Sequence, residues 1–383
     1  MNKIRVFYII DHLATGAGTE NQLVGLIRHL DRERFEPTLI TLADFDIRSL
    51  PEHHDPTCRH ISLGFKGKLI SPNGISRLLR LARMIRRERV DIVHTYFLDS
   101  NIIGVLGGVL GRCKRIVVSR RDTGYWHTPR LLFFLRQINR LADYFLVNAN
   151  AIKQTVARHE QFPADRIEVV HNGHFDLPAD GQTPLERSEF GIPDDAPLVG
   201  IVANLRPVKR LDNFVRVASR ISDQQTCFMI VGTGELCDDL LEQAQSAGLE
   251  RRLVITHTLG NIYDYINMFD VGVLTSDSEG LSNTLIECQL CGRPAVAFDV
   301  GGNREVIEDG RTGYLVEPGD LEAMRQKIEA LLADPSLRAE MGARASLHAR
   351  RLFDGERMVE LTADFYRRIL GAKKKFIKAK EPV

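Results

Sequence analysis

The chain has 383 residues, too many for one ordinary core, and therefore predicts two domains, since a domain usually holds about 100–200 residues. Its 44% hydrophobic and 26% charged residues are typical of a soluble globular protein. The first apolar run holds five residues before Asp11, which excludes a signal peptide or membrane span there and favours a buried strand. Six scattered cysteines lack the spacing of a disulfide framework and indicate a cytoplasmic location.

The net charge of +1 hides an uneven distribution. Residues 59–140 contain 17 Lys and Arg against four Asp and Glu, a local balance of +13. Such a block suits nucleic acid, anionic lipid or a phosphorylated substrate, although a solvated helix face has the same appearance. Few aromatic residues are interleaved with the arginines, which argues against single-stranded nucleic acid. We expect no nucleic acid partner and a peripheral contact with an anionic membrane surface at the inner face of the cytoplasmic membrane.

Short apolar or β-branched runs alternate with amphipathic stretches along the whole chain. Continuous apolar strands separated by helices predict parallel sheets covered on both faces, and two such series predict two doubly wound α/β domains. The expected strands are residues 4–10, 37–42, 90–94, 115–119 and 143–148 in the first half, and 198–204, 227–232, 252–256, 270–275 and 294–298 in the second.

The segment between the two series is dense in Pro, Gly and Asp and indicates a linker with a short helix. We expect an N-terminal domain at 1–175, a linker at 176–197 and a C-terminal domain at 198–350. Residues 351–383 are expected to form a helix that returns to the N-terminal domain, followed by a basic tail.

Two amphipathic segments of the first half concern its surface. The helix expected at 75–90 carries an apolar stripe that should pack on the sheet, formed by Ile75, Leu78, Leu79, Ala82 and Ile85. The run LLFFL at 131–135 is harder to explain as core alone and is a candidate for facing lipid or an apolar acceptor.

Three loops that follow expected strands suit an anionic ligand, because the carboxyl ends of parallel strands gather at one edge of a sheet. In ATGAGTE (14–20), Gly18 and Thr19 open a helix expected to begin at Asn21, whose free N–H groups can bind an anion. The loop ANLRPVKRLDNF (203–214) clusters Arg206, Lys209 and Arg210 where they could clamp a diphosphate, and Asn204 is a further candidate for binding substrate. In VGTGE (231–235), Gly232 and Gly234 permit close approach of a ligand or form a plain turn.

The stretch SEGLSNTLIEC (278–288) carries the most specific pattern. A helix is expected to begin near Ser282 and to end at Gly292, with Pro294 beyond it. Glu279, before the helix, suits the hydroxyls of a sugar, and Glu287, one turn inside, suits the vicinal hydroxyls of a ribose. Between the two glutamates, free N–H groups suit phosphate, and the candidate binding residues there are Gly280, Leu281, Ser282, Asn283 and Thr284.

Taken together, these motifs resemble the retaining GT-B glycosyltransferases of family 4. The resemblance rests on Glu279-x7-Glu287, on Lys209 in RPVK, and on VGTG, HTLGNI (257–262), GGNREVIEDGRTGYLV (301–316) and HNG (171–173). It implies two facing Rossmann-like domains with an interdomain cleft, a nucleotide-sugar donor held by the C-terminal one and an acceptor held by the N-terminal one. It also implies retention, with Gly18 in the N-terminal glycine loop, Lys209 on phosphate, Glu279 on the donor sugar and Glu287 on the ribose.

The sequence departs from the family pattern at two places. Ala203-Asn204 stand where many members have a glycine-arginine pair, so Arg206 is the candidate to replace that arginine. Many members have a histidine after the strand that corresponds to 115–119, where this chain has Arg120 and Arg121. His94, at the end of its own expected strand, is a further candidate for binding substrate.

These features predict a hexosyltransferase that uses a UDP- or GDP-sugar and a glycan or lipid-linked acceptor, in cell-surface polysaccharide or lipopolysaccharide biosynthesis. Lys209, Arg206 and Glu279 are the expected catalytic residues. No cofactor or metal is expected, although DFD (44–46) would be the carboxylate pair of a metal-dependent enzyme. An epimerase or phosphorylase of the same fold and a non-enzymatic anionic-lipid-binding protein are rival interpretations. A dehydrogenase is disfavoured, because GAGTEN lacks the third glycine of a dinucleotide-binding loop.

Overall fold

The computed structural model describes residues 3–13, 18–47, 50, 55–65, 71–175, 185–257 and 261–372. The chain forms two compact units. Unit 1 comprises Met1–Phe175 with Gly355–Val383, and unit 2 comprises Asp176–Asp354. Each unit has a parallel sheet and its own buried apolar core. In the part of the chain that is described, no helix combines the length and apolar content that a membrane crossing requires.

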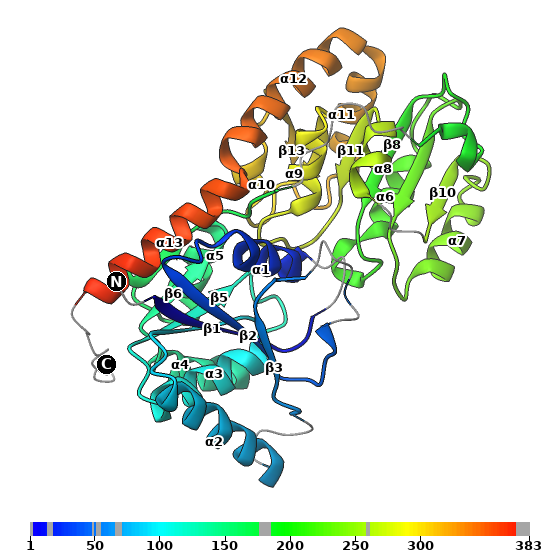
Figure 1. The fold of residues 1–383 in the computed structure, drawn as a ribbon. Coiled ribbons are helices and arrows are strands. Elements are labelled where there is room, and N and C mark those ends of the chain that lie inside the picture. The colour runs from blue at the N-terminus through cyan, green and yellow to red at the C-terminus, as the bar shows by residue number, and fades with distance from the viewer. Residues whose placement is uncertain are drawn as a thin grey trace. The chain divides into compact units, whose positions relative to one another are not determined.

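Unit 1 is built on a seven-stranded sheet in the order β3-β2-β1-β4-β5-β6-β7 (Figure 1). All neighbouring strands are parallel, and the central ones are buried over most of their length because helices cover both faces. The strands are β1 (Ile4–Ile10), β2 (Phe35–Thr41), β3 (Arg59–Ser62), β4 (Ile92–Thr95), β5 (Arg115–Arg120), β6 (Tyr144–Val147) and β7 (Ile167–Val169).

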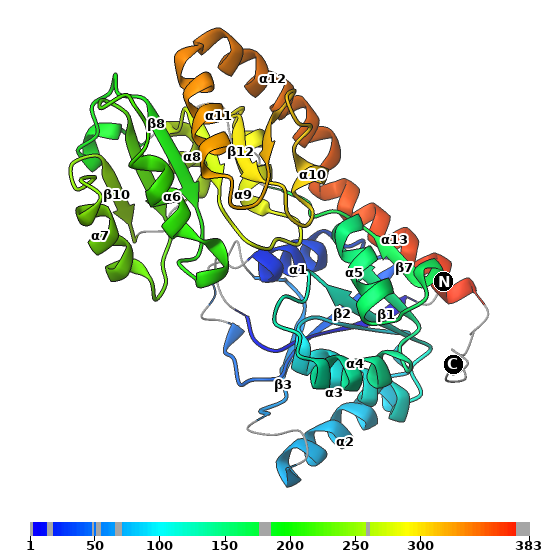
Figure 2. The same ribbon diagram turned by 180° about the vertical axis from the view of Figure 1, so that it is seen from behind.

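The helices of unit 1 cover the sheet in two layers, with α1 and α13 on one face and α2, α3 and α4 on the other (Figures 1 and 2). Their bounds are α1 (Gly18–His29), α2 (Pro72–Arg87), α3 (Leu98–Leu110), α4 (Pro129–Asn139), α5 (Asn150–His159) and α13 (Gly355–Gly371). The last helix returns to unit 1 and contributes Met358, Phe365 and Tyr366 to its core.

The stripe expected to bury α2 is partly wrong. Ile75 and Leu79 are 49% and 40% exposed, whereas Leu81 is fully buried beside Ala82 and Ile85. A methyl group at Gly107 of α3 would collide with Leu81, so the close approach of these two helices selects the face that carries Leu81.

Unit 2 has a six-stranded parallel sheet in the order β10-β9-β8-β11-β12-β13. Its strands are β8 (Leu198–Val202), β9 (Cys227–Val231), β10 (Leu253–Thr256), β11 (Val271–Leu274), β12 (Ala295–Phe298) and β13 (Gly313–Val316). Its helices are α6 (Leu211–Ala218), α7 (Cys237–Ser246), α8 (Ile262–Met268), α9 (Asn283–Leu290), α10 (Asn303–Val306), α11 (Leu321–Ala333) and α12 (Pro335–Leu352). The order reverses between β8 and β11, and ligands of open α/β sheets bind at such a point.

Candidate functional site

The helix α9 of unit 2 begins at the carboxyl edge of the sheet. Ser282 caps it, with its Oγ accepting a hydrogen bond from the backbone N–H of Leu285 at 3.3 Å. The Oγ1 of Thr284 donates to the carbonyl oxygen of Val202 at 2.8 Å, so the first turn is fixed to the end of β8. The side chains of both predicted binding residues therefore have structural partners, and what the start of the helix offers to an anion is its positive dipole end.

The loop after β8 carries Lys209 and is fastened to the loop after β11 by three contacts. Thr275 Oγ1 donates a hydrogen bond to the carbonyl oxygen of Lys209 at 3.0 Å. The backbone N–H of Asp277 donates to the carbonyl oxygen of Val208, also at 3.0 Å. The guanidinium of Arg210 forms an ion pair with the carboxylate of Asp277 at 3.1 Å. The backbone of Arg210 is in the left-handed region, with a φ of 47°. These contacts hold the backbone from Val208 to Arg210, from which the Lys209 side chain extends.

Lys209 and Glu279 are brought into direct contact. Lys209 Nζ donates to Glu279 Oε1 at 2.7 Å, and the side chains of the two residues are 23% and 9% exposed. The pair lies beside the first turn of α9, since Glu279 stands three residues before the cap. The ammonium group and the helix N-terminus together form a cationic place suited to an anion.

Arg206 and Asn204 lie on the same loop as Lys209, and both are exposed. Within the described residues, the Arg206 guanidinium has no ion-pair or hydrogen-bond partner, whereas Arg210 pairs with Asp212 and Asp277. Arg206 is therefore the cation of this loop that is available to a ligand without loss of an internal contact.

The glycines Gly232 and Gly234 are needed for packing within unit 2. Their φ angles are 156° and 155°, and a Cβ at either position would collide with the carbonyl oxygen of Ala203 or of Leu205. The backbone N–H of Leu205 donates to the carbonyl of Thr233 at 2.9 Å. The close approach inferred from VGTG is thus an approach between this turn and the loop that leads to Lys209.

Glu287 is half-buried in the second turn of α9. Burial raises the pKa of its carboxyl group to about 7. No hydrogen bond or ion pair of this carboxyl group occurs among the described residues. Because this carboxylate is half-buried and has no internal partner among the described residues, two hydroxyl donors of a ligand can bind to it without displacing a contact of the fold.

The residues that hold the backbone of Glu279 in place were not among the predicted site residues. Gly301, after β12, lies so close to the carbonyl oxygen of Glu279 that a side chain there would collide with it. The backbone N–H of Gly302 donates to the carbonyl of Gly280 at 2.9 Å. The GG pair in GGNREV was the available signal, because paired glycines after a strand often mark a close backbone approach.

Two predicted site residues of unit 1 are core residues instead. His94 is fully buried, and its ring nitrogens lie 2.6 Å from the hydroxyl of Tyr366 and 2.8 Å from that of Ser119. Arg120 is 5% exposed and forms a two-point ion pair with Glu160, at 2.8 and 2.9 Å. Both side chains have structural partners and neither is accessible in this structure, which argues against the predictions that they bind substrate.

The remaining predicted residues of unit 1 are accessible. Arg121 is partly exposed, donates to Asn172 Oδ1 at 2.8 Å and lies over the ring of Tyr96. Gly18 is exposed and Thr19 half-buried at the start of α1, which begins three residues before the expected Asn21. Of the glycine loop itself, residues 14–17 lie outside the described residues, as do positions 258–260 of HTLGNI.

A metal site is not evident in the described part of the chain, where no three His, Cys, Asp or Glu side chains gather as ligands. Asp44 and Asp46 of the DFD sequence lie in unit 1, after β2. The cationic groups of the candidate site, Lys209 and Arg206, lie in unit 2.

Two family models match this chain. Glycosyltransferase Family 4 matches residues 16–174, and Glycosyl transferases group 1 matches residues 182–348. The chain is 29% identical to an alpha-D-kanosaminyltransferase of Streptomyces kanamyceticus, over 70% of this chain and 75% of the relative. It is 25% identical to a UDP-Gal:alpha-D-GlcNAc-diphosphoundecaprenol alpha-1,3-galactosyltransferase of Escherichia coli, over 80% and 83% of the two chains. The crystal structure of Anabaena HepE with UDP and glucose has a similar fold, with a TM-score of 0.82, 19% identity and coverage of 95% and 100%.

Proposed function

Because the chain belongs to the family 4 glycosyltransferases of GT-B fold, we propose that it moves a hexose-type sugar from a UDP- or GDP-sugar to its acceptor with retention of anomeric configuration. The observation that carries this proposal is the contact of Lys209 with Glu279 at 2.7 Å beside the capped N-terminus of α9. A cation, a helix N-terminus and a carboxylate that accepts hydrogen bonds match the diphosphate and sugar of such a donor.

The proposed mechanism is electrostatic. Cleavage of the bond between sugar and phosphate develops negative charge on the diphosphate, which Lys209, Arg206 and the first turn of α9 would stabilise. Glu279 orients the sugar, and Glu287 accepts hydrogen bonds from the two ribose hydroxyls. Retention is proposed from the family alone, since no side chain of this site is assigned as a covalent nucleophile.

Metal independence is part of the proposal. The two cationic side chains and the helix N-terminus can together offset the charge of a diphosphate, which is the task of a divalent cation in metal-dependent transferases. We expect transfer to continue unchanged in EDTA. Loss of transfer in EDTA, with recovery on addition of Mg²⁺ or Mn²⁺, would contradict this part.

For the acceptor we propose a glycan or a lipid-linked glycan of cell-surface polysaccharide or lipopolysaccharide biosynthesis. The name of the Escherichia coli relative specifies a diphosphoundecaprenol acceptor, and the basic block at 59–140 suits an anionic surface. The protein would then work in the cytoplasm, as a peripheral protein at the inner face of the membrane.

Binding and product analysis test the proposal in sequence. A panel of UDP-, GDP- and ADP-sugars is screened by thermal shift, and the best donor is incubated with and without acceptor glycolipids. We expect stabilisation by one nucleotide class, and a glycosylated product with free nucleoside diphosphate when the acceptor is present. Conversion of the donor into an epimer without any acceptor, or release of a sugar phosphate by inorganic phosphate, would instead favour an epimerase or a phosphorylase.

A further inference from the structure

Two helices of unit 1 expose an unusual combination of side chains. Helix α2 exposes Ile75 and Leu79 near its start and Arg80, Arg83 and Arg86 towards its end. Helix α4 exposes Phe133, at 66%, and Phe134, at 43%. We call the outward surface of these two helices the α2–α4 face.

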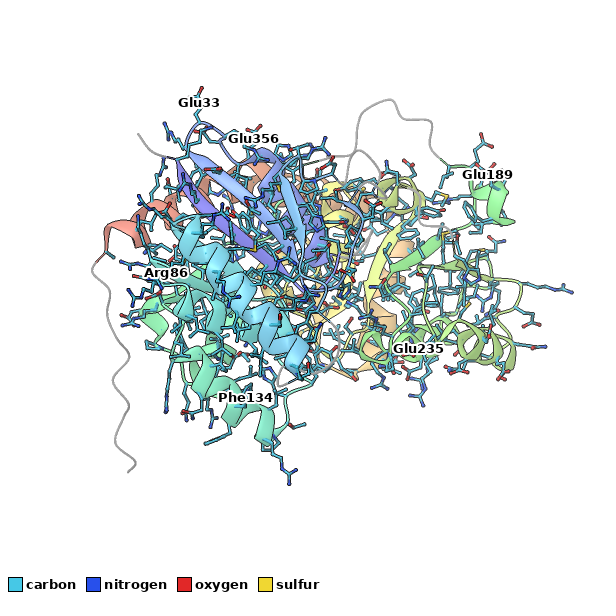
Figure 3. The ribbon with its side chains drawn as sticks, turned by 60° about the horizontal axis from the view of Figure 1, so that its bottom comes forward. Glu33, Arg86, Phe134, Glu189, Glu235 and Glu356 are labelled. Carbon is cyan, nitrogen blue, oxygen red and sulfur yellow. The ribbon has the colours of Figure 1, made fainter. Side chains whose placement is uncertain are left out.

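The two helices belong to one layer. Helix α3 packs against both α2 and α4, and all three cover the same side of the sheet (Figures 1 and 2). Figure 3 shows the labelled Arg86 and Phe134 on α2 and α4 at the surface of this layer. Leu110, at the end of α3, is 53% exposed. The apolar and basic groups therefore lie on neighbouring helices of one compact unit.

The charge of the α2–α4 face has a single sign. Helices α2 and α4 contain seven arginines and no Asp or Glu between them. The acid nearest in sequence to α2, its capping residue Glu88, is paired with Arg59 at 2.8 Å. A layer that exposes guanidinium groups together with Phe, Ile and Leu side chains fits a surface that offers phosphates above hydrocarbon, which is the interface of an anionic bilayer.

We propose that the α2–α4 face docks unit 1 on an anionic lipid bilayer, with Phe133, Phe134, Ile75 and Leu79 entering the headgroup region and the arginines contacting lipid phosphates. This inference deepens the proposed membrane location of the enzyme by naming the surface. It involves none of the proposed donor-binding residues, all of which lie in unit 2. Failure of vesicle binding and failure of donor binding are therefore separate results.

Vesicle sedimentation with the full chain tests the proposal. We expect binding to phosphatidylglycerol-containing vesicles, weak binding to pure phosphatidylcholine, and a decline with salt. An arginine near an anionic surface accounts for about a fivefold change in partitioning, so Arg80→Gln/Arg83→Gln/Arg86→Gln is expected to lose on the order of a hundredfold. Phe133→Ser/Phe134→Ser is expected to weaken binding at every salt concentration.

The matched control removes the same kinds of side chain from α12 of unit 2, where Leu347 is 73% exposed and Arg350 and Arg351 are exposed. The variant Leu347→Ser/Arg350→Gln/Arg351→Gln should bind vesicles like the wild type, and all variants should keep the wild-type thermal shift with UDP-sugar. Equal binding to neutral and anionic vesicles, an equal loss in the control, or binding to RNA of matched charge without vesicle binding would overturn the proposal.

A second readout locates the contact. Trp126 is the single tryptophan of the chain and lies in the loop just before α4, next to Tyr125, which is 60% exposed. We expect brominated phosphatidylglycerol vesicles to quench its fluorescence, and the α4 variant to lose this quenching while the α12 control keeps it. Binding to vesicles without quenching would place the contact elsewhere and contradict the proposed face.

Discussion

Replacing Glu287 by glutamine separates the cost of this half-buried acid from its use in binding. Its pKa in the folded chain is raised to about 7 from 4.5, so between these pH values the folded chain binds more protons than the unfolded chain. The free energy of unfolding therefore falls as pH rises from about 4.5 to 7, and the full penalty applies above pH 7. The shift sets an upper limit of about 3 kcal/mol, and partial exposure of the side chain reduces the expected penalty to about 1–2 kcal/mol.

This penalty predicts the melting behaviour of Glu287→Gln without ligand. At pH 8 the variant should melt about 2–8 °C above the wild type, because a neutral amide does not carry the penalty. Near pH 4.5 the two proteins should melt at similar temperatures, since the wild-type carboxyl group is largely protonated in the folded chain. Differential scanning calorimetry at both pH values measures the difference, with Glu242→Gln on the exposed surface of α7 as the control.

Donor affinity should rise with pH over the range in which the free energy of unfolding falls. Ribose hydroxyls donate to the ionised carboxylate, so a bound donor lowers the pKa of Glu287, and donor affinity should rise by up to about tenfold per pH unit until pH 7. UDP-glucose suits the calorimetric titration, because its diphosphate has no ionisation in this range. Glu287→Gln should bind about 10–100-fold more weakly at pH 8 and lose the pH dependence. A variant that keeps the wild-type affinity and pH profile would refute the role given to this side chain.

The other predictions concern the remaining cations and the buried pair. Lys209→Ala should lower kcat by about 10²–10³ with saturating donor, measured as release of nucleoside diphosphate, and an unchanged rate would contradict its role. Arg206→Gln should lower the same rate by about tenfold or more. Its melting temperature should not change, because Arg206 is exposed and has no internal partner among the described residues. A fall in melting temperature with full activity would instead assign Arg206 a structural role. Arg120→Leu should lower the free energy of unfolding, measured in urea, by about 3–5 kcal/mol, because Glu160 would stay buried without its cation. The double variant Arg120→Leu/Glu160→Leu should recover most of this loss. Loss of activity with wild-type stability would instead support a role for Arg120 in substrate binding.

The sequence predicts the strands well where they are buried on both faces. The ten expected strands all occur, with ends within about two residues, because continuous apolar runs mark central parallel strands. The missed strands lack that signal. β3 (Arg59–Ser62) is a polar edge strand, β7 (Ile167–Val169) has three residues, and β13 (Gly313–Val316) begins with glycine.

The candidate site of unit 2 could be predicted because its residues follow strand ends, where topology places them together. Lys209 and Glu279 are 70 residues apart in sequence, yet the loops after β8 and β11 bring them into contact. The burial of His94 and Arg120, which the sequence did not reveal, has a common cause. Both residues lie at or near the ends of buried strands, and whether such a side chain faces the site or the core depends on partners distant in sequence, here Tyr366 and Glu160.

The most direct test of the account is a crystal structure of the chain with UDP-glucose, or with the donor that the panel selects. We expect the diphosphate to lie within hydrogen-bond distance of Lys209 Nζ and at the N-terminus of α9, with both ribose hydroxyls on the carboxylate of Glu287. A nucleotide bound with its ribose directed away from Glu287, or a complex in which Lys209 keeps Glu279 as its partner and makes no contact with phosphate, would contradict it.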